Sequence, residues 1–235
     1  LAEACSMAIN ITNKNKILLS SAINPNYLEV LKTYLSYRDV KIDFLEIKDG
    51  VTDIKQKIDN ISDYACIAIQ SPNYFGLLEN WSSWSEKNNN ETLLIAVSDP
   101  ISLSMIKSPG ECGADIYCGE GQSLGNYMNL GGPYLGLLSS KLKYIRKIPG
   151  RIIGKTEDLD GKDGYVLTLQ AREQHIRRDK ANSNICTNQS LLALRASIYL
   201  SLLGKNGILE IAKISFNKSQ YAAKHISKIP GFSIP

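Results

Sequence analysis

Residues 119–125, Gly-Glu-Gly-Gln-Ser-Leu-Gly, have the composition of a loop whose backbone amides can hold a phosphate. Their spacing is not that of the known motifs, because the third glycine is one residue late for G-x-G-x-x-G and a Walker lysine is missing. Ser123 also suggests the nucleophile motif G-x-S-x-G, but that motif needs a strand running directly into a helix, whereas residues 125–132 look like a loop. Nucleotide binding is therefore an alternative for which we expect no thermal stabilisation by NAD or ATP.

Asp99 is the second candidate for chemistry, because it directly follows the apolar run 93–97 and precedes Pro100. Carboxylates at the ends of strands in α/β sheets often face the ligand crevice. An Asp-Pro pair is equally typical of a helix N-cap. From the residues alone we favour the cap.

The densest basic cluster lies between residues 172 and 180. It consists of Arg172, His175, Arg177, Arg178 and Lys180. A solvated helix face is the default interpretation, but guanidinium groups also match carboxylates and phosphates in bidentate geometry. The chain has only one other histidine, His225, so no metal site is predicted.

The composition describes a globular chain of 235 residues with a net charge of +4. This charge is too small to indicate nucleic-acid binding, and no apolar run approaches the roughly 20 residues of a membrane span. The five cysteines include no C-x-x-C pair, which argues against zinc and disulfide frameworks. We therefore expect neither a nucleic acid nor a membrane as partner, and a reducing cytoplasmic location.

Short apolar strands alternate with amphipathic helices over the first 110 residues. We expect strands at 16–20, 40–45, 64–69 and 93–97, and helices beginning at Pro25, at 51–61 with Ile54, Ile58 and Ile61 on one face, and at 78–87. Such alternation is the signature of a parallel sheet covered on both faces, which binds ligands at the carboxyl ends of its strands.

The glycine-rich middle, residues 109–154, is expected to form loops around a returning strand at 134–139, with another strand at 165–169. The loops to watch for ligand binding are residues 70–76 and 98–103. From Thr187 the pattern is helical, with Gly204 as a helix C-cap and a second helix beginning near Gly207.

Several long strings carry a family resemblance. They are residues 70–76, 110–115, 119–125, 129–136, 149–154, 183–189 and, most distinctively, LTLQAREQHIRR at 167–178. These strings resemble the N-terminal subunit (subunit 1) of glycine dehydrogenase (decarboxylating), the P-protein of the glycine cleavage system. The resemblance covers essentially the whole chain, although the family's subunit is longer at both ends.

The resemblance implies an α/β fold of the fold-type-I, aminotransferase-like class of pyridoxal-phosphate (PLP) enzymes. The chain would comprise a large domain at 1–186 and, at 187–235, a linking helix with the start of a smaller C-terminal domain. The implied reaction is decarboxylation of glycine with transfer of the aminomethyl group to the lipoyl H-protein. The cofactor acts in that reaction as the electron sink.

The resemblance also assigns positions. Counting from Gly113-Ala114-Asp115 places Gln122 and Ser123 where the catalytic subunit has a histidine and the lysine that forms the Schiff base. A serine has no amine and cannot form an imine. Asp99 falls where such folds place the aspartate that faces the pyridine nitrogen. The implied picture is a degenerate site, with PLP bound mainly by the partner, the C-terminal subunit 2.

Two segments are candidates to complete that partner's site. One is the loop with Asn129, Gly131, Gly132 and Tyr134, for which a structural turn is the alternative. The other is the basic stretch with Arg172, His175 and Arg177 as substrate-binding candidates, for which packing and subunit contact are the alternatives. We expect a homo- or hetero-oligomer.

Two rival functions remain. An autonomous PLP enzyme would need a lysine that reaches the cofactor, and Lys141 and Lys143 lie beyond the Gly-Gly-Pro-Tyr loop, in the wrong place. A purely structural scaffold would associate through exposed apolar surface.

Overall fold

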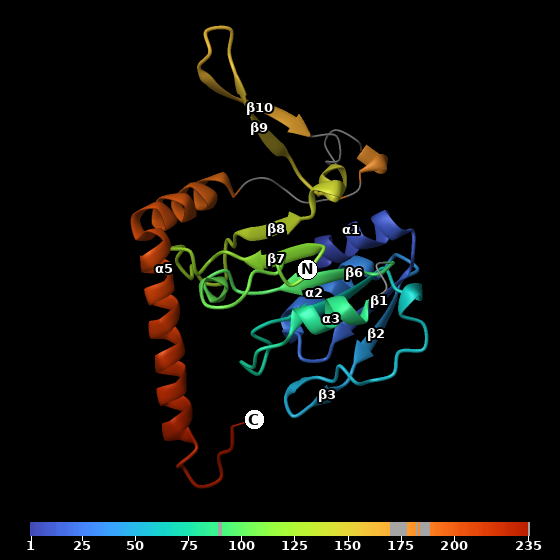
Figure 1. Ribbon diagram of the computed structural model, residues 1–235, viewed down its shortest axis with the longest axis vertical. Coiled ribbons are helices and arrows are strands. Elements are labelled where there is room, and N and C mark those ends of the chain that lie inside the picture. The colour runs from blue at the N-terminus through green and yellow to red at the C-terminus, as the bar shows by residue number, and fades with distance from the viewer. Residues whose placement is uncertain (89–90, 170–177, 182, 184–188, 235) are drawn as a thin grey trace.

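The computed structural model describes residues 1–88, 91–169, 178–181, 183 and 189–234, and its centre is a six-stranded sheet (Figure 1). The strands run in the order β2-β1-β5-β6-β7-β8. Their bounds are β1 Lys16–Ser20, β2 Lys41–Leu45, β5 Cys66–Gln70, β6 Leu93–Val97, β7 Ile116–Glu120 and β8 Gly136–Ser140. Every neighbouring pair is parallel except β7 with β8, which is antiparallel. The predicted α/β class with a mostly parallel sheet is confirmed.

The central strands are apolar along their whole length because both faces of the sheet are covered. All five residues of β6 are buried, and alternate residues serve opposite cores. Leu93, Ile95 and Val97 pack with α1 (Ala2–Thr12) and α2 (Pro25–Leu35) on one face. Leu94 and Ala96 pack on the other face with the tryptophans of α3 (Trp81–Lys87).

Local sequence signals position the two helices that follow β1 and β5. The Asn24 side chain accepts a hydrogen bond from the backbone N–H of Asn26 at 2.9 Å, and Pro25 occupies the first turn of α2. Asn80 caps α3 in the same way by accepting from the N–H of Ser83. Each cap fixes a helix start at the carboxyl end of the preceding strand.

The helix predicted at 51–61 is wrong. The turn at Asp49-Gly50 joins β3 (Ile47–Lys48) to β4 (Val51–Thr52), and irregular chain then leads to the 3₁₀ turn η1 (Ile61–Asp63). The apolar residues at helical spacing do pack on the core, but the backbone finds other partners. The ammonium of Lys87 on α3 donates to the carbonyls of Ile54 and Gln56 at 2.7 Å each, which replaces a helical ladder there.

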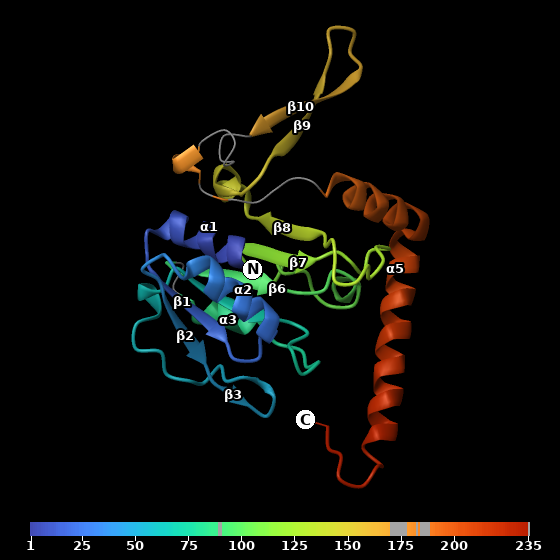
Figure 2. The same cartoon turned by 180° about the vertical axis from the view of Figure 1, so that it is seen from behind.

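An antiparallel hairpin of β9 (Ile152–Glu157) and β10 (Asp163–Leu169) projects from the body, as Figure 2 shows. Short 3₁₀ turns follow β6, β8 and β10: η2 (Ser102–Ser104), η3 (Leu142–Lys147) and η4 (Arg178–Lys180). The strands β7 and β9 were not predicted, because their glycines mask the apolar pattern.

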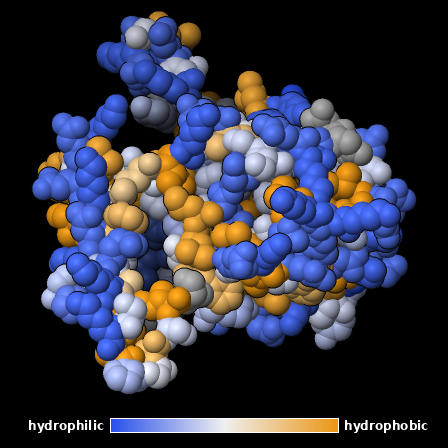
Figure 3. All heavy atoms as spheres, turned by 60° about the horizontal axis from the view of Figure 1, so that its bottom comes forward, coloured by the Kyte–Doolittle hydropathy of each residue, from blue (hydrophilic) through white to orange (hydrophobic). Residues whose placement is uncertain are grey.

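The chain continues into α5 (Ser190–Ile226), which bends at Gly204 into two helical segments. Gly204 has φ 60° and ψ −173°, so the predicted end of the first helix at this glycine is confirmed. Only Ala196 and Ala212 of this helix are buried. In the space-filling view of Figure 3, apolar atoms lie on both sides of a hollow in this face of the molecule.

Replacing Gly204 with alanine is expected to lower the free energy of unfolding by about 1–3 kcal/mol, because that combination of φ and ψ is open almost only to glycine. No atom lies within 4 Å of the added Cβ, so the cost is backbone strain alone. Urea unfolding followed by circular dichroism measures it. Gly110→Ala is the matched control, since it has equal space and no positive φ. Equal losses from the two substitutions would contradict the assignment.

Candidate functional site

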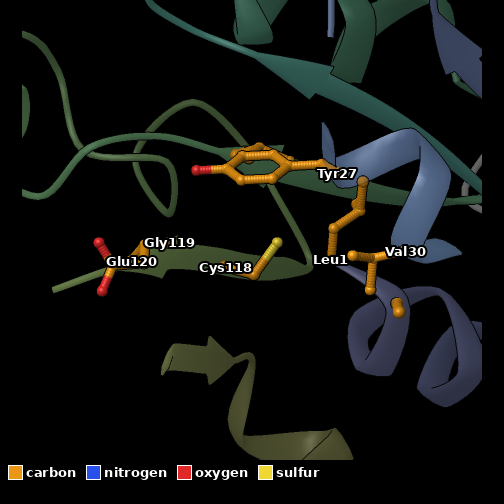
Figure 4. A pocket seen from close by; sticks show the side chains of 8 residues that line it. Leu1, Tyr27, Val30, Cys118, Gly119 and Glu120 are labelled. Atoms are coloured by element: carbon orange, nitrogen blue, oxygen red, sulfur yellow. The ribbon is translucent and has the colours of Figure 1, made fainter. Parts of the chain in front are cut away.

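A cavity of about 170 Å³ opens at the carboxyl ends of β6 and β7, the edge at which such sheets bind ligands. Figure 4 shows its walls, which come from α1, α2, β6 and β7. The lining residues are Leu1, Ala2, Tyr27, Val30, Val97, Cys118, Gly119 and Glu120. The Tyr27 ring extends from α2 across the end of β7, and its hydroxyl points towards the end where Glu120 lies.

Acidic and phenolic groups gather around this cavity. Burial raises the pKa of the Tyr27 phenol, and the charges of Glu120 and then Cys118, Asp99 and Tyr134 raise it further. Burial is likewise the main reason why the pKa of the Tyr117 phenol, which donates to the carbonyl of Ser98 at 3.2 Å, is raised. Glu120 and Asp99 are the two carboxylates among these groups.

Glu120 holds the glycine-rich loop in place. One of its carboxylate oxygens accepts the backbone N–H of Gln122 at 2.8 Å and that of Leu135 at 3.0 Å. Gln122 and Leu135 are the first and last residues of the segment 122–135. The Glu120 carboxylate therefore holds the two ends of this segment together. Neither Glu120 nor Tyr27 was predicted as a site residue; the end of β7 was the signal for Glu120, and that strand was not recognised.

Gln122 and Ser123 lie in the turn directly after β7. The Ser123 hydroxyl is buried and has no hydrogen-bond partner among the described residues. Gly125, with φ 81°, lies so close to Tyr199 of α5 that an added Cβ would come within 2.7 Å of its ring. The turn therefore packs against Tyr199 of α5. At Ser123 it carries a buried hydroxyl, at the position where the resemblance places the lysine of the catalytic subunit.

Asp99 follows β6 at the same edge, as predicted, and is exposed. Its carboxylate accepts the backbone N–H of Ile101 at 2.8 Å, and its carbonyl accepts the N–H of Ser102 at 3.2 Å. These contacts form a local turn before η2, whose N-cap residue is Ile101 and has no side-chain cap, so Asp99 is not the predicted N-cap. Asp99 also contributes to the field that acts on Tyr27 and Tyr117, so it faces the same edge.

The candidate loop with Asn129, Gly131, Gly132 and Tyr134 is exposed for most of its length. Leu130 at its tip has φ 52°, a left-handed conformation that is uncommon for leucine, and its side chain is fully exposed. The loop ends beside β7, because the N–H of Leu135 donates to the Glu120 carboxylate at 3.0 Å and the Leu135 carbonyl accepts the N–H of Gly121 at 2.7 Å. The remaining predicted residues, Arg172, His175 and Arg177, lie outside the described residues.

A buried polar network lies under the neighbouring loop 71–79 and was not predicted. One oxygen of the Glu79 carboxylate, Oε1, accepts three hydrogen bonds: from the N–H and the hydroxyl of Thr52 at 2.9 Å each, and from the Asn73 amide at 3.0 Å. The Glu79 N–H in turn donates to the Ser71 hydroxyl at 3.0 Å. The network fixes the loop at the end of β5.

The described residues at the β6–β7 edge offer PLP no lysine. Its phosphate is normally held by cations or helix N-termini; the N-terminus of α1, at Leu1 and Ala2, lines this cavity, but no described lysine or arginine does. Glu120 and Asp99 would repel a phosphate, and Ser123 offers no amine. Within the described part of the chain there is also no metal-binding cluster of histidine, cysteine or carboxylate groups, and no helix is long and apolar enough to cross a membrane.

The fold is that of the fold-type-I PLP enzymes. The structure superposes on a cysteine desulfurase from Escherichia coli with a TM-score of 0.62 at 14% identity over 98% of this chain and 57% of that one. It also superposes on a probable N-succinyldiaminopimelate aminotransferase from Thermus thermophilus, with a TM-score of 0.60 at 11% identity over 97% and 56%. At these identities the likeness concerns the fold alone.

The chain belongs to the glycine cleavage system P-protein family, whose model matches residues 1–233. It is 48% identical to a probable glycine dehydrogenase (decarboxylating) subunit 1 from Desulforamulus reducens, over all of this chain and 53% of the relative. A crystal structure of glycine decarboxylase (P-protein) in inhibitor-bound form superposes with a TM-score of 0.91 at 38% identity, over 98% of this chain and 52% of that one. The chain thus spans about half the length of the relatives it matches.

Proposed function

We propose that this chain is part of the subunit of glycine decarboxylase that lacks the cofactor-binding lysine. The complete subunit would support glycine decarboxylation and aminomethyl transfer to the lipoyl H-protein in the cytoplasm, together with a catalytic subunit 2. The observation that carries the proposal is the buried alcohol of Ser123 at the lysine position, at a cavity that no described lysine lines. Relatives named subunit 1 support it, because that name implies a second subunit.

PLP on the partner subunit would supply the electron sink for decarboxylation. The part assigned to this chain is positional. Glu120 holds the two ends of the segment 122–135 together, and Tyr199 packs against its turn, so the exposed loop 129–134 is presented from a fixed base. We assign this loop to the partner's cofactor pocket, where it would orient groups and exclude water.

Further assignments follow from the same proposal. Arg172, His175 and Arg177 would supply cations for the carboxylate of the substrate, since no described lysine or arginine lines the cavity at the β6–β7 edge. Residues 1–186 would form the large domain, and residues 187–235 the linking helix and the start of a smaller domain. The exposed apolar side chains of α5 are consistent with an oligomer.

The test is reconstitution of glycine–bicarbonate exchange from the two full-length subunits with PLP and H-protein. We expect each subunit alone to be at least about 100-fold slower than the mixture, a difference of roughly 2.7 kcal/mol in activation free energy. Replacing Ser123 with alanine should leave the exchange rate of the mixture unchanged, because no step uses this hydroxyl. Full exchange by the partner alone would refute the proposal and favour the scaffold reading.

A further inference from the structure

A second cavity, of about 260 Å³, lies on the α3 side of the sheet, at the end of β5. It shares no lining residue with the cavity at β6 and β7. The groups that matter for binding are Ser71, Glu79, Trp81, Ile106 and Lys107. Since a water molecule takes up about 30 Å³ in the liquid, the space accommodates a ligand of roughly eight or nine non-hydrogen atoms.

The polar centre of this cavity is the Glu79 carboxylate. Glu79 is only 9% exposed, and the three donors described above all bind the same oxygen, Oε1. Its second oxygen, Oε2, has no donor among the described residues, although the residue lines the cavity. Oε2 is not among the buried side-chain atoms without a partner, so it is accessible from the cavity, and a cationic donor that enters gains a charge-assisted hydrogen bond there.

The other polar groups suit a ligand that carries both charges. Lys107 is exposed where it lines the cavity, and its ammonium makes no hydrogen bond or ion pair with any described residue. The Ser71 hydroxyl accepts the Glu79 N–H, and its own proton has no acceptor within the described chain. Carboxylate and ammonium poles thus occur in one small cavity, which selects a zwitterion over a simple cation or anion.

Between the two poles the cavity walls are apolar. The indole N–H of Trp81 donates to the carbonyl of Ile69 at 3.0 Å. The ring can therefore offer a ligand only its apolar surface. Leu78 and Ile106 complete the apolar lining. These walls favour an aliphatic side chain, because burying apolar surface contributes about 25 cal/mol per Å².

We propose that this cavity binds a small α-amino acid with an aliphatic side chain, with its ammonium group on Glu79 and its carboxylate facing Lys107. The proposal goes beyond the proposed function, because it requires neither the cofactor nor a catalytic role for this chain. A bound ligand would add contacts to Ser71 and Glu79, which belong to the 71–79 loop. Binding would therefore stabilise this loop at the carboxyl end of β5.

The test is equilibrium dialysis of labelled L-leucine, which has nine non-hydrogen atoms, against the full-length subunit without PLP. We expect saturable binding with a Kd on the order of 1 mM. Two analogues of leucine measure the contributions of the two charged groups separately. 3-Methylbutylamine lacks the carboxylate and should bind a few-fold more weakly than leucine. 4-Methylpentanoate lacks the ammonium and should not bind measurably. Glycine, without the side chain, should bind at least about tenfold more weakly.

Two variants locate the ligand. Glu79→Gln should weaken leucine binding at least about tenfold, because the amide places a donor where the ammonium needs an acceptor. Lys107→Met should weaken it about threefold and should leave 3-methylbutylamine unaffected, since its charge is exposed. Lys57→Met, a similarly exposed lysine away from the cavity, is the control and should have no effect.

Three results would overturn the proposal: no saturable leucine binding, equal binding of leucine and 4-methylpentanoate, or leucine binding that Lys107→Met leaves unchanged. The Lys107 variant keeps the test decisive if Glu79→Gln fails to fold, because the Lys107 side chain has no described structural partner. None of these results bears on the reconstitution experiment, so the failure of one proposal can be told from the failure of the other.

Discussion

Replacing Glu79 with alanine is expected to lower the free energy of unfolding by about 3 kcal/mol. The substitution removes the acceptor shared by the N–H and hydroxyl of Thr52 and by the Asn73 amide. The hydroxyl keeps Ser20 at 2.6 Å and the amide keeps the Gly50 carbonyl at 2.9 Å, but the Thr52 N–H has no other described partner. Each buried donor left unsatisfied costs about 1–3 kcal/mol, and water that enters the new space offsets part of the sum. Chemical unfolding followed by tryptophan fluorescence measures the change, because Trp81 and Trp84 lie in the adjacent core.

The matched control for this prediction is Glu29→Ala. Glu29 forms an exposed ion pair with Lys32 at 2.8 Å, and its loss should cost less than about 0.5 kcal/mol. A loss below about 1 kcal/mol for Glu79→Ala would show that the network does not hold the 71–79 loop. The intermediate substitution Glu79→Gln keeps one acceptor oxygen and should fall between the two.

Replacing both Met128 and Leu130 with serine is expected to reduce glycine–bicarbonate exchange by the reconstituted complex about tenfold or more. Both side chains are exposed, Leu130 fully, so they contribute little to the stability of this chain by itself. If the 129–134 loop and the adjoining Met128 enter the partner's cofactor pocket, however, both side chains are buried there, and the lost contacts correspond to about 1.4 kcal/mol or more. Exchange assays and thermal unfolding of the variant subunit separate the two effects.

Leu159→Ser provides the control for the loop variant. Leu159 is just as exposed, but it lies at the tip of the β9–β10 hairpin. We expect unchanged exchange for this variant, and a melting temperature for Met128→Ser/Leu130→Ser within about 1–2 °C of that of the native subunit. If both variants lost exchange equally, the loop would have no special role.

The parts of the fold that were predictable are those in which local pattern and burial agree. The strands β1 and β6 are continuous apolar runs because each is covered on both faces, and the start of α2 carries its cap and proline in sequence. The helix predicted at 51–61 is wrong, because isoleucines at helical spacing also occur in irregular chain that packs on the core. Lys87, which is distant in sequence, binds the carbonyls of this segment instead. Long-range partners of this kind leave no local trace.

The candidate site divides in the same way. Asp99 could be placed at the carboxyl edge because it follows the apolar run that forms β6, whereas Ser123 was assigned only through the resemblance, since β7 was not predicted. Tyr27 and Glu120 could not, because their role depends on α2 lying across the end of a strand whose glycines hid it. Glu79 was missed for a related reason, since its three donors come from β4 and from the loop after β5.

The most direct test of the central claim is borohydride reduction of the complete two-subunit complex with PLP, followed by peptide mapping of both chains. Borohydride fixes the cofactor to whichever lysine holds it. We expect a pyridoxyl-lysine in the partner subunit and none in this chain, because Ser123 offers no amine and the Lys141 ammonium forms an ion pair with Asp115 at 2.8 Å. A pyridoxyl group on any lysine of this chain would contradict it.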